Sequence, residues 1–158
     1  MAKLTESLLV KASLKEVWDF YFEPRYWVSW VDGFQEVEAV DGDYPQVGAE
    51  LVWRSTPAGR GRVTETVLEH SPRTRHLIRF ADPESEGELL SEFGIEGDAT
   101  RVRLTFTYRL PGNRILAGIT DRLFVRGQVR NALRRTLLRF KHEAEEAAHF
   151  GREPPASA

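Results

Sequence analysis

The stretch RVRLTFTYRL, residues 101–110, decides the fold. Its apolar side chains alternate with polar ones, so that Val102, Leu104, Phe106 and Tyr108 fall on the same face. A segment with this period forms a β-strand that has one buried and one solvent-exposed face. Residues 101–110 therefore predict one strand of an antiparallel sheet whose outer face meets water.

The same alternation recurs upstream of this strand. Within GAELVWR, the residues Ala49, Leu51 and Trp53 fall on one face. Turn-forming sequences such as DGDYP, TPAGRG and SPRT follow one another at hairpin spacing. We therefore expect six consecutive strands, over residues 34–40, 48–54, 61–69, 75–80, 88–95 and 101–110.

Downstream of the last strand the period changes to that of a helix. Pro111-Gly112-Asn113 ends the strand, and residues 114 to about 148 predict one long helix or two abutting ones. Its apolar face comprises Ile115, Ile119, Val129, Leu133, Leu137, Phe140 and Ala144. The tail over 150–158 has little to pack and is expected to be disordered, which leaves a single domain over 1–149.

The N-terminal part predicts a strand followed by two short helices. Residues 4–12 read as the strand, and a capping box formed by Ser13 and Glu16 begins a helix over 13–22. PRYWVSWV, residues 24–31, predicts the second helix, because proline suits a first helical turn. The complete order predicts an α+β fold in which a seven-stranded antiparallel sheet curves around the long helix.

Composition restricts the classes of partner. The chain has 158 residues, no cysteine and a formal net charge of -2, which gives no basic face for nucleic acid. No apolar run approaches the roughly 18 residues of a membrane span, and no signal-peptide pattern opens the chain. We expect a cytoplasmic protein, a monomer or weak homodimer, without stable membrane insertion; transient membrane contact remains open.

Several motifs resemble those of the START-like, birch-pollen-allergen-like superfamily called SRPBCC, especially its polyketide cyclase/dehydrase and lipid-transport branch. They are VKASLKEVWDF, Trp30, VGAEL, SPRTR and ATRVRLTFTYRL, and the resemblance covers residues 4–146. It implies a helix-grip fold with a mostly apolar cavity between the sheet and the long helix. Members of this superfamily bind sterols, lipids, hormones or polyketides, and a minority are enzymes.

On this resemblance, the cavity wall is expected to include ten residues. They are Trp27, Trp30, Phe34, Leu51, Trp53, Glu65, Phe93, Phe106, Tyr108 and Arg126. For Trp27, Trp30 and Phe34, which follow the first helix closely, two interpretations stay open. They face a ligand at the rim of the cavity, or they fill the junction between the short helices and the sheet.

The long helix raises a separate question, because Arg122, Arg126 and Arg130 are spaced four apart on its apolar side. Either the helix bends near Gly127 and the arginines turn outward, or Arg126 enters the cavity and meets a carboxylate. Glu65 is the candidate partner, because an unpaired buried guanidinium is costly and Glu65 lies in phase with buried residues.

Three functions follow from these observations. The first is the binding of a small, largely hydrophobic ligand, lipid or polyketide-like, in the cavity. The second is a cofactor-independent polyketide aromatase/cyclase or dehydrase, in which Glu65 and Arg126 would act as base and oxyanion stabiliser. The third is a ligand-free protein-interaction module. No cofactor is expected, and no functional metal at His142, Glu146 and His149, which share a helical face.

Overall fold

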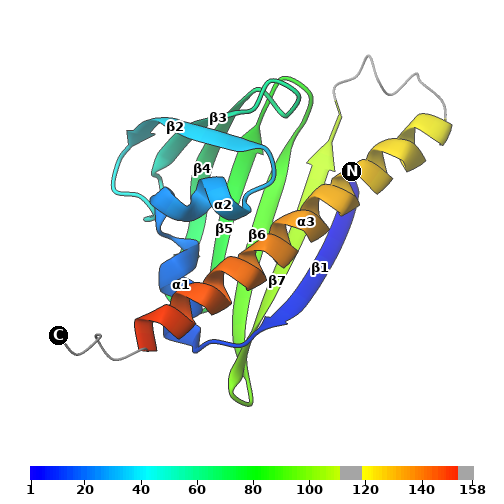
Figure 1. Ribbon diagram of the computed structural model, residues 1–158. Helices are drawn as coiled ribbons and strands as arrows, with labels where there is room; N and C mark the ends of the chain where they lie inside the picture. The colour runs from blue at the N-terminus through cyan, green and yellow to red at the C-terminus, as the bar shows by residue number, and fades with distance from the viewer. Residues whose placement is uncertain (111–118, 153–158) are drawn as a thin grey trace.

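The computed structural model describes residues 1–110 and 119–152, in which one antiparallel sheet is crossed by one long helix (Figure 1). The sheet has seven strands in the order β1-β7-β6-β5-β4-β3-β2. The strands are β1 (Ala2–Val10), β2 (Phe34–Asp41), β3 (Glu50–Ser55), β4 (Arg62–Ser71), β5 (Arg75–Ala81), β6 (Glu86–Glu96) and β7 (Ala99–Arg109). The predicted seven-stranded sheet is confirmed.

Helical segments lie between β1 and β2 and at the C-terminal end of the chain. They are α1 (Leu14–Tyr21), the 3₁₀ turn η1 (Pro24–Tyr26), α2 (Trp27–Trp30) and α3 (Ile119–Arg152). The predicted second short helix is thus a 3₁₀ turn followed by a single α-turn. Its start fits the sequence, because the Pro24 ring presets the helical φ and has no N–H to leave unpaired.

The capping box predicted at the start of α1 is present. The Ser13 hydroxyl accepts a hydrogen bond from the backbone N–H of Glu16 at 3.2 Å and donates one to the Glu16 carboxylate at 3.0 Å. The Ser13 hydroxyl thereby satisfies one of the backbone N–H groups that a helix leaves unpaired in its first turn. The chain therefore turns sharply out of β1 and brings α1 under the sheet.

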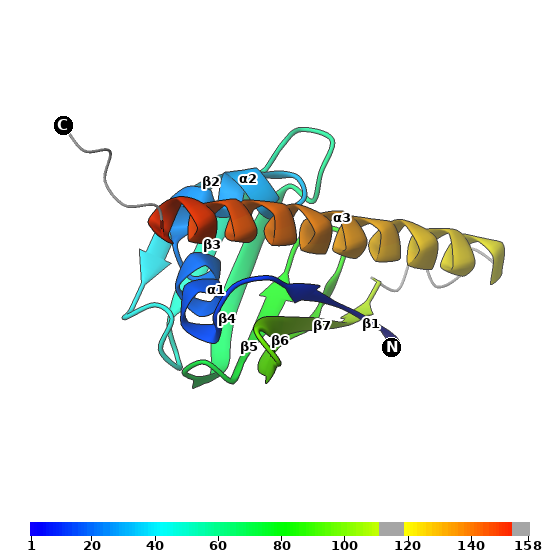
Figure 2. The same cartoon turned by 60° about the horizontal axis from the view of Figure 1, so that its bottom comes forward.

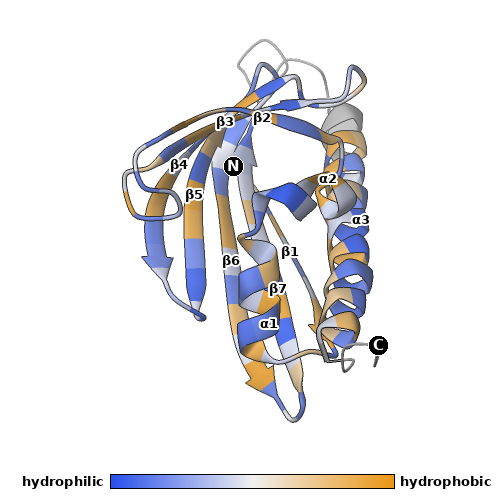
Figure 3. Cartoon of the chain, turned by 60° about the vertical axis from the view of Figure 1, so that its left-hand side comes forward, coloured by the Kyte–Doolittle hydropathy of each residue, from blue (hydrophilic) through white to orange (hydrophobic). Residues whose placement is uncertain are grey.

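Strand β7 has the alternation that its sequence predicts. Val102, Leu104 and Tyr108 are buried, while Arg103 and Arg109 on the opposite face are exposed. In Figure 3, hydrophobic and hydrophilic bands alternate along the strands in the same way. One face of the sheet is thus the inner wall of the molecule.

Helix α3 crosses this inner face, as Figures 1 and 2 show from two directions, while α1 and α2 lie at one end of the sheet. Leu133, Leu137, Phe140 and Ala144 are buried at helical spacing along its C-terminal half. The helix-grip α+β architecture is confirmed, and it leaves a concave space between sheet and helix in which a site can form.

Some predictions fall outside the described residues. These are the helix start at residue 114 with Ile115, the side chains of Ile119 and Arg122, and the tail beyond residue 152. Helix α3 continues to Arg152, three residues into the tail predicted to begin at residue 150. Within the described ranges, no helix has both the length and the hydropathy needed to span a membrane.

Candidate ligand cavity

A cavity of about 730 Å³ lies between the inner face of the sheet and the N-terminal half of α3. This volume is within the range typical of small-molecule sites. Its principal aromatic and aliphatic lining residues are Tyr21, Trp27, Trp30, Phe34, Tyr44, Leu51, Trp53, Ile78, Leu89, Leu104, Phe106, Tyr108, Val125, Val129, Ala132 and Leu133. The lining is therefore predominantly apolar.

The sheet supplies one wall because alternate side chains of β3, β4 and β7 point inward. On β3 these are Leu51 and Trp53, and on β7 they are Leu104, Phe106 and Tyr108. Strand pairing, which maintains this alternation, places all five on the same face. The wall is thus determined by the sheet register.

The elbow formed by η1 and α2 supplies a second wall. The Trp27 indole Nε1 donates to the carbonyl of Tyr21 at 2.8 Å, and its ring packs edge-on against Phe34, with centroids 6.0 Å apart. Trp30 packs against Phe140 of α3 at 4.9 Å. Both tryptophans are buried and both line the cavity, so the elbow aromatics fill the junction and also form the cavity wall.

Glu65 is an ionisable side chain deep in the inner face of the sheet. It pairs across the strands with Leu51 on one side and Phe80 on the other, both of which are buried. Its Oε1 accepts a hydrogen bond from the Trp53 indole Nε1 at 2.7 Å. Burial raises the pKa of Glu65, and the indole hydrogen bond and the nearby charge of Arg60 partly oppose that shift.

Arg60 reaches the cavity from the β3–β4 loop. Its Nε donates to Oδ2 of Asp82 at 2.8 Å, and its Nη2 lies 2.7 Å from the same oxygen. The guanidinium carbon lies 4.6 Å from the ring centroid of Phe80. The Asp82 side chain is only 1% exposed, so the carboxylate of this ion pair has almost no contact with solvent.

Three tyrosines add hydroxyl groups to the lining. The Tyr21 hydroxyl lies 2.7 Å from the Ser91 hydroxyl, and burial raises the pKa of Tyr21 to about 12. Burial also raises the pKa of Tyr44 well above its usual value, and it raises the pKa of Tyr108. These hydroxyls therefore stay protonated at neutral pH and can donate hydrogen bonds.

Two histidines meet at the border between the cavity and the core. His76 lines the cavity, and its Nδ1 lies 3.0 Å from Nδ1 of His70. Burial, with a further contribution from His70, lowers the pKa of His76 to about 3. Within the described ranges no hydrogen-bond partner reaches Nε2 of His76. His76 is consequently neutral at physiological pH.

The predicted wall residues divide into two groups. Eight of the ten lie in the cavity lining, namely Trp27, Trp30, Phe34, Leu51, Trp53, Glu65, Phe106 and Tyr108. Phe93 and Arg126 do not belong to the lining found here. Phe93 instead packs against Trp18 and Tyr21, with ring centroids 5.0 and 5.2 Å away.

Arg126 does not form the buried pair considered from the sequence. Its Nη2 donates to the backbone carbonyl of Lys3 on β1 at 3.2 Å. Arg130 and Arg134 likewise face β1, where both contact Glu6. The cation whose charge acts on the pKa of Glu65 is Arg60. Arg60 was missed because a loop residue has no periodicity that would reveal where its side chain points.

Tyr44, His76 and Asp82 were also missed. Tyr44 and Asp82 lie in turns, where the sequence shows turn chemistry only. His76 has the parity of the buried residues Ile78 and Phe80, and this period-2 relation was the one indication that could have identified it.

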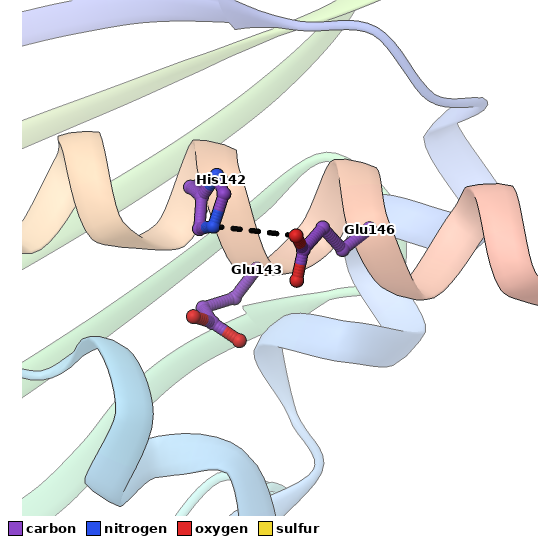
Figure 4. A group of neighbouring side chains, drawn as sticks. All are labelled: His142, Glu143 and Glu146. Atoms are coloured by element: carbon purple, nitrogen blue, oxygen red, sulfur yellow. Dashed lines mark ion pairs between the residues drawn. The ribbon is translucent and has the colours of Figure 1, made fainter.

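The group of possible metal-binding side chains in the described part of the chain lies away from the cavity, on the exposed C-terminal half of α3 (Figure 4). Ligand atoms of His142, Glu143 and Glu146 lie within 4.8 Å of one another, and His142 Nε2 is 3.4 Å from Glu146 Oε1. Such exposed i, i+4 pairs occur commonly without an ion. His149, considered from the sequence, is not in this group.

Comparisons with known proteins agree with the geometry. A family model described as polyketide cyclase / dehydrase and lipid transport matches residues 1–145. No curated protein sequence matches. Together with the structural similarities below, the family match confirms the resemblance to the SRPBCC superfamily.

Three solved structures illustrate the shared fold. The Zhui aromatase/cyclase from Streptomyces sp. R1128 has a TM-score of 0.76 at 16% identity, with 97% of this chain and 99% of that chain covered. A conserved protein from Geobacillus kaustophilus has a TM-score of 0.72 at 14% identity (94% and 98% covered). Ara h 8.0201 has a TM-score of 0.72 at 10% identity (92% and 98% covered).

Proposed function

The chain belongs to the polyketide cyclase/dehydrase and lipid transport family, and from that premise we propose that it binds a small, largely hydrophobic molecule between the sheet and α3. The observation that carries this proposal is the cavity of about 730 Å³ with its predominantly aromatic and aliphatic lining. Burial of a ligand's apolar surface at about 25 cal/mol per Å² supplies the affinity.

Polar groups in the lining would orient the ligand. The hydroxyls of Tyr44 and Tyr108 form no hydrogen bond with any described residue, and Glu65 Oε2 is likewise without a described partner. A ligand with one or two polar atoms on an apolar body would complement these groups. Such a molecule could be lipid-like or polyketide-like, and carriage of it through the cytoplasm is the corresponding role.

Binding is favoured over ring-closure catalysis by the position of Arg126. The catalytic alternative requires an oxyanion stabiliser opposite the Glu65 carboxyl, but Arg126 contacts β1 and is absent from the described lining. The charge of Arg60 lowers the pKa of Glu65, but the Arg60 guanidinium is paired with Asp82. Neither arginine therefore provides the guanidinium oxyanion stabiliser that this mechanism would pair with Glu65.

Native mass spectrometry of protein purified gently from its own host tests the proposal, followed by denaturing extraction of any bound molecule. Ala132 on α3 lines the cavity, so Ala132→Phe should fill part of the volume and reduce ligand occupancy at least about tenfold. The matched control Ala39→Phe adds the same ring on the exposed face of β2 and should leave occupancy unchanged.

Two outcomes contradict the proposal. One is the absence of any adduct, combined with no thermal shift across a panel of lipids and aromatic polyketides. The other is an adduct that survives Ala132→Phe at full occupancy, since it would then bind outside the cavity. Thermal unfolding of both variants establishes that the comparison is made between folded proteins.

A further inference from the structure

Glu65 differs from the other carboxylates of the cavity lining. Asp32 contacts Arg135 and Arg139, and Asp82 contacts Arg60. No lysine, arginine or histidine among the described residues forms an ion pair with Glu65. An ionised carboxyl in this desolvated position is costly unless a cation pairs with it, so Glu65 either holds its proton or is suited to pair with a positively charged ligand.

The position of Glu65 makes it available to a ligand. Leu51 and Phe80, its partners on the two adjacent strands, flank Glu65 within the sheet. The accessible surface of its side chain faces the cavity. Only Oε1 is engaged, by the Trp53 indole at 2.7 Å. That hydrogen bond holds the carboxyl in place and leaves Oε2 open toward the cavity.

The rings beside Glu65 suit the same kind of ligand. Trp53, Phe34, Trp27 and Tyr44 form a continuous series, with successive centroid distances of 5.3, 6.0 and 5.7 Å. The negative faces of aromatic rings attract an organic cation, most strongly where water is excluded. The guanidinium carbon of Arg60 lies 4.6 Å from the ring centroid of Phe80 and 5.8 Å from that of Trp53, at one end of the series. Among the described residues no cation lies over Phe34, Trp27 or Tyr44, so these three rings remain available to a ligand.

The charged side chains of the cavity lining also affect which ligand charge is favoured. Its described residues include four carboxylates, Asp32, Glu65, Asp82 and Glu84, and two guanidinium groups, Arg60 and Arg135. Asp32 is paired with Arg135 and Arg139, and Asp82 is paired with Arg60. The charge that Glu65 carries when ionised is therefore available to attract a ligand cation.

We propose that the cavity selects an organic ammonium ion, a protonated amine on an aromatic or polycyclic body, whose charged nitrogen sits between Glu65 and the rings of Trp53, Phe34, Trp27 and Tyr44. This inference rests on the proposed ligand-binding function and narrows its ligand class. Because burial raises the pKa of Glu65, a cation that favours the ionised form releases a proton where the carboxyl is still protonated.

Two probes of the same shape test the inference: 2-(1-naphthyl)ethylamine, which is protonated at pH 7, and the neutral 2-(1-naphthyl)ethanol. Calorimetric titration of the full chain should give at least about tenfold tighter binding of the amine. Glu65→Gln keeps a carbonyl oxygen for the Trp53 hydrogen bond but removes the charge. It should lower amine affinity about tenfold or more and leave alcohol affinity unchanged.

Glu50→Gln is the matched control, because it removes one negative charge from the exposed face of the neighbouring strand β3. It should change neither affinity. The pH profile needs no substitution and remains decisive if Glu65→Gln fails to fold. Amine affinity should rise as pH increases through the raised pKa of Glu65, whereas alcohol affinity should be constant.

Equal affinity for the two probes, or an equal effect of Glu65→Gln on both, overturns the ammonium inference. If the alcohol binds and Ala132→Phe abolishes its binding, the proposed ligand cavity stands while the ammonium inference fails. If neither probe binds, the ammonium inference is overturned for this ligand shape, and the adduct experiment decides independently whether the proposed function survives.

Discussion

The two ends of the groove between the sheet and α3 both contain many aromatic residues but differ in packing. At the closed end, Phe140 is 1% exposed and meets Phe20, Tyr21 and Trp30 edge-on. At the open end, Phe106 on β7 faces the cavity and is only partly buried. Aromatic content alone therefore does not distinguish a core from a binding site.

The difference arises from the covering elements. At the closed end α1 and α2 lie beneath α3 and bring their aromatic rings into the groove. At the open end no helix lies between α3 and the described sheet (Figure 1). There α3 contributes Val129, Gln128 and Ala132 to the cavity lining. The sheet curvature then leaves space that side chains do not fill.

Phe140→Ala should have the largest effect. Removal of a fully buried ring leaves a cavity among Phe20, Tyr21 and Trp30 and should lower the free energy of unfolding by about 3–5 kcal/mol. Phe106→Ala should cost about 2 kcal/mol or less, since that ring is only partly buried and faces the cavity, although it also stacks on Phe80. Urea denaturation measures both, and equal losses would contradict the distinction.

The second prediction concerns the histidine pair at the border of the two ends. Burial gives His76 a pKa of about 3 in the folded chain, against an ordinary value of 6.5, so between these pH values the unfolded chain binds a proton that the folded chain does not. Stability should therefore fall as pH drops from 6.5 toward 3, with a slope of up to about 1.4 kcal/mol per pH unit from this group.

His76→Phe keeps an aromatic ring beside Phe22 and Tyr44 and should remove most of this slope. His142→Phe is the control, because that residue is exposed on α3. Urea denaturation at several pH values measures the slopes. An unchanged slope in His76→Phe would mean that other groups cause the acid sensitivity.

Glu65 at the open end should give a smaller effect of opposite sign. Burial raises its pKa, so the folded state holds its proton more tightly than the unfolded state, and this carboxyl destabilises the fold increasingly as pH rises through the raised pKa. Glu65→Gln should therefore make the ligand-free protein more stable at pH 8 than the wild type. Lower stability at pH 8 would show that the ionised form is well solvated in the cavity.

The smallest effect is expected at the rim. Asp32 contacts Arg135 and Arg139 of α3 at 3.1 Å, but both arginine side chains are about half exposed. Asp32→Asn should lower the free energy of unfolding by at most about 1 kcal/mol, and added salt should reduce that difference. Urea titrations at low and high salt provide the measurement, and a salt-independent loss would contradict this interpretation.

Local patterns in the sequence determined most of the fold. Alternation in 101–110 predicted β7, the capping box at Ser13 predicted the start of α1, and the apolar spacing of α3 predicted its buried face. Strand parity also placed Leu51, Trp53 and Glu65 on the inner face. These features follow from the strand period of 2 residues and the helix period of 3.6 residues, and both periods can be read directly from the order of apolar and polar residues.

Tertiary structure alone decided which inward-facing residues meet the cavity and which meet other side chains. Phe93 and Phe106 have the same inward parity, yet Phe93 packs against Trp18 whereas Phe106 lines the open end. Arg60 and Arg126 differ in the same way. Arg60 reaches the cavity from a loop, whereas Arg126 on α3 contacts the backbone of β1. Periodicity fixes the face of an element, whereas cavity position depends on how distant elements pack, which no local pattern contains.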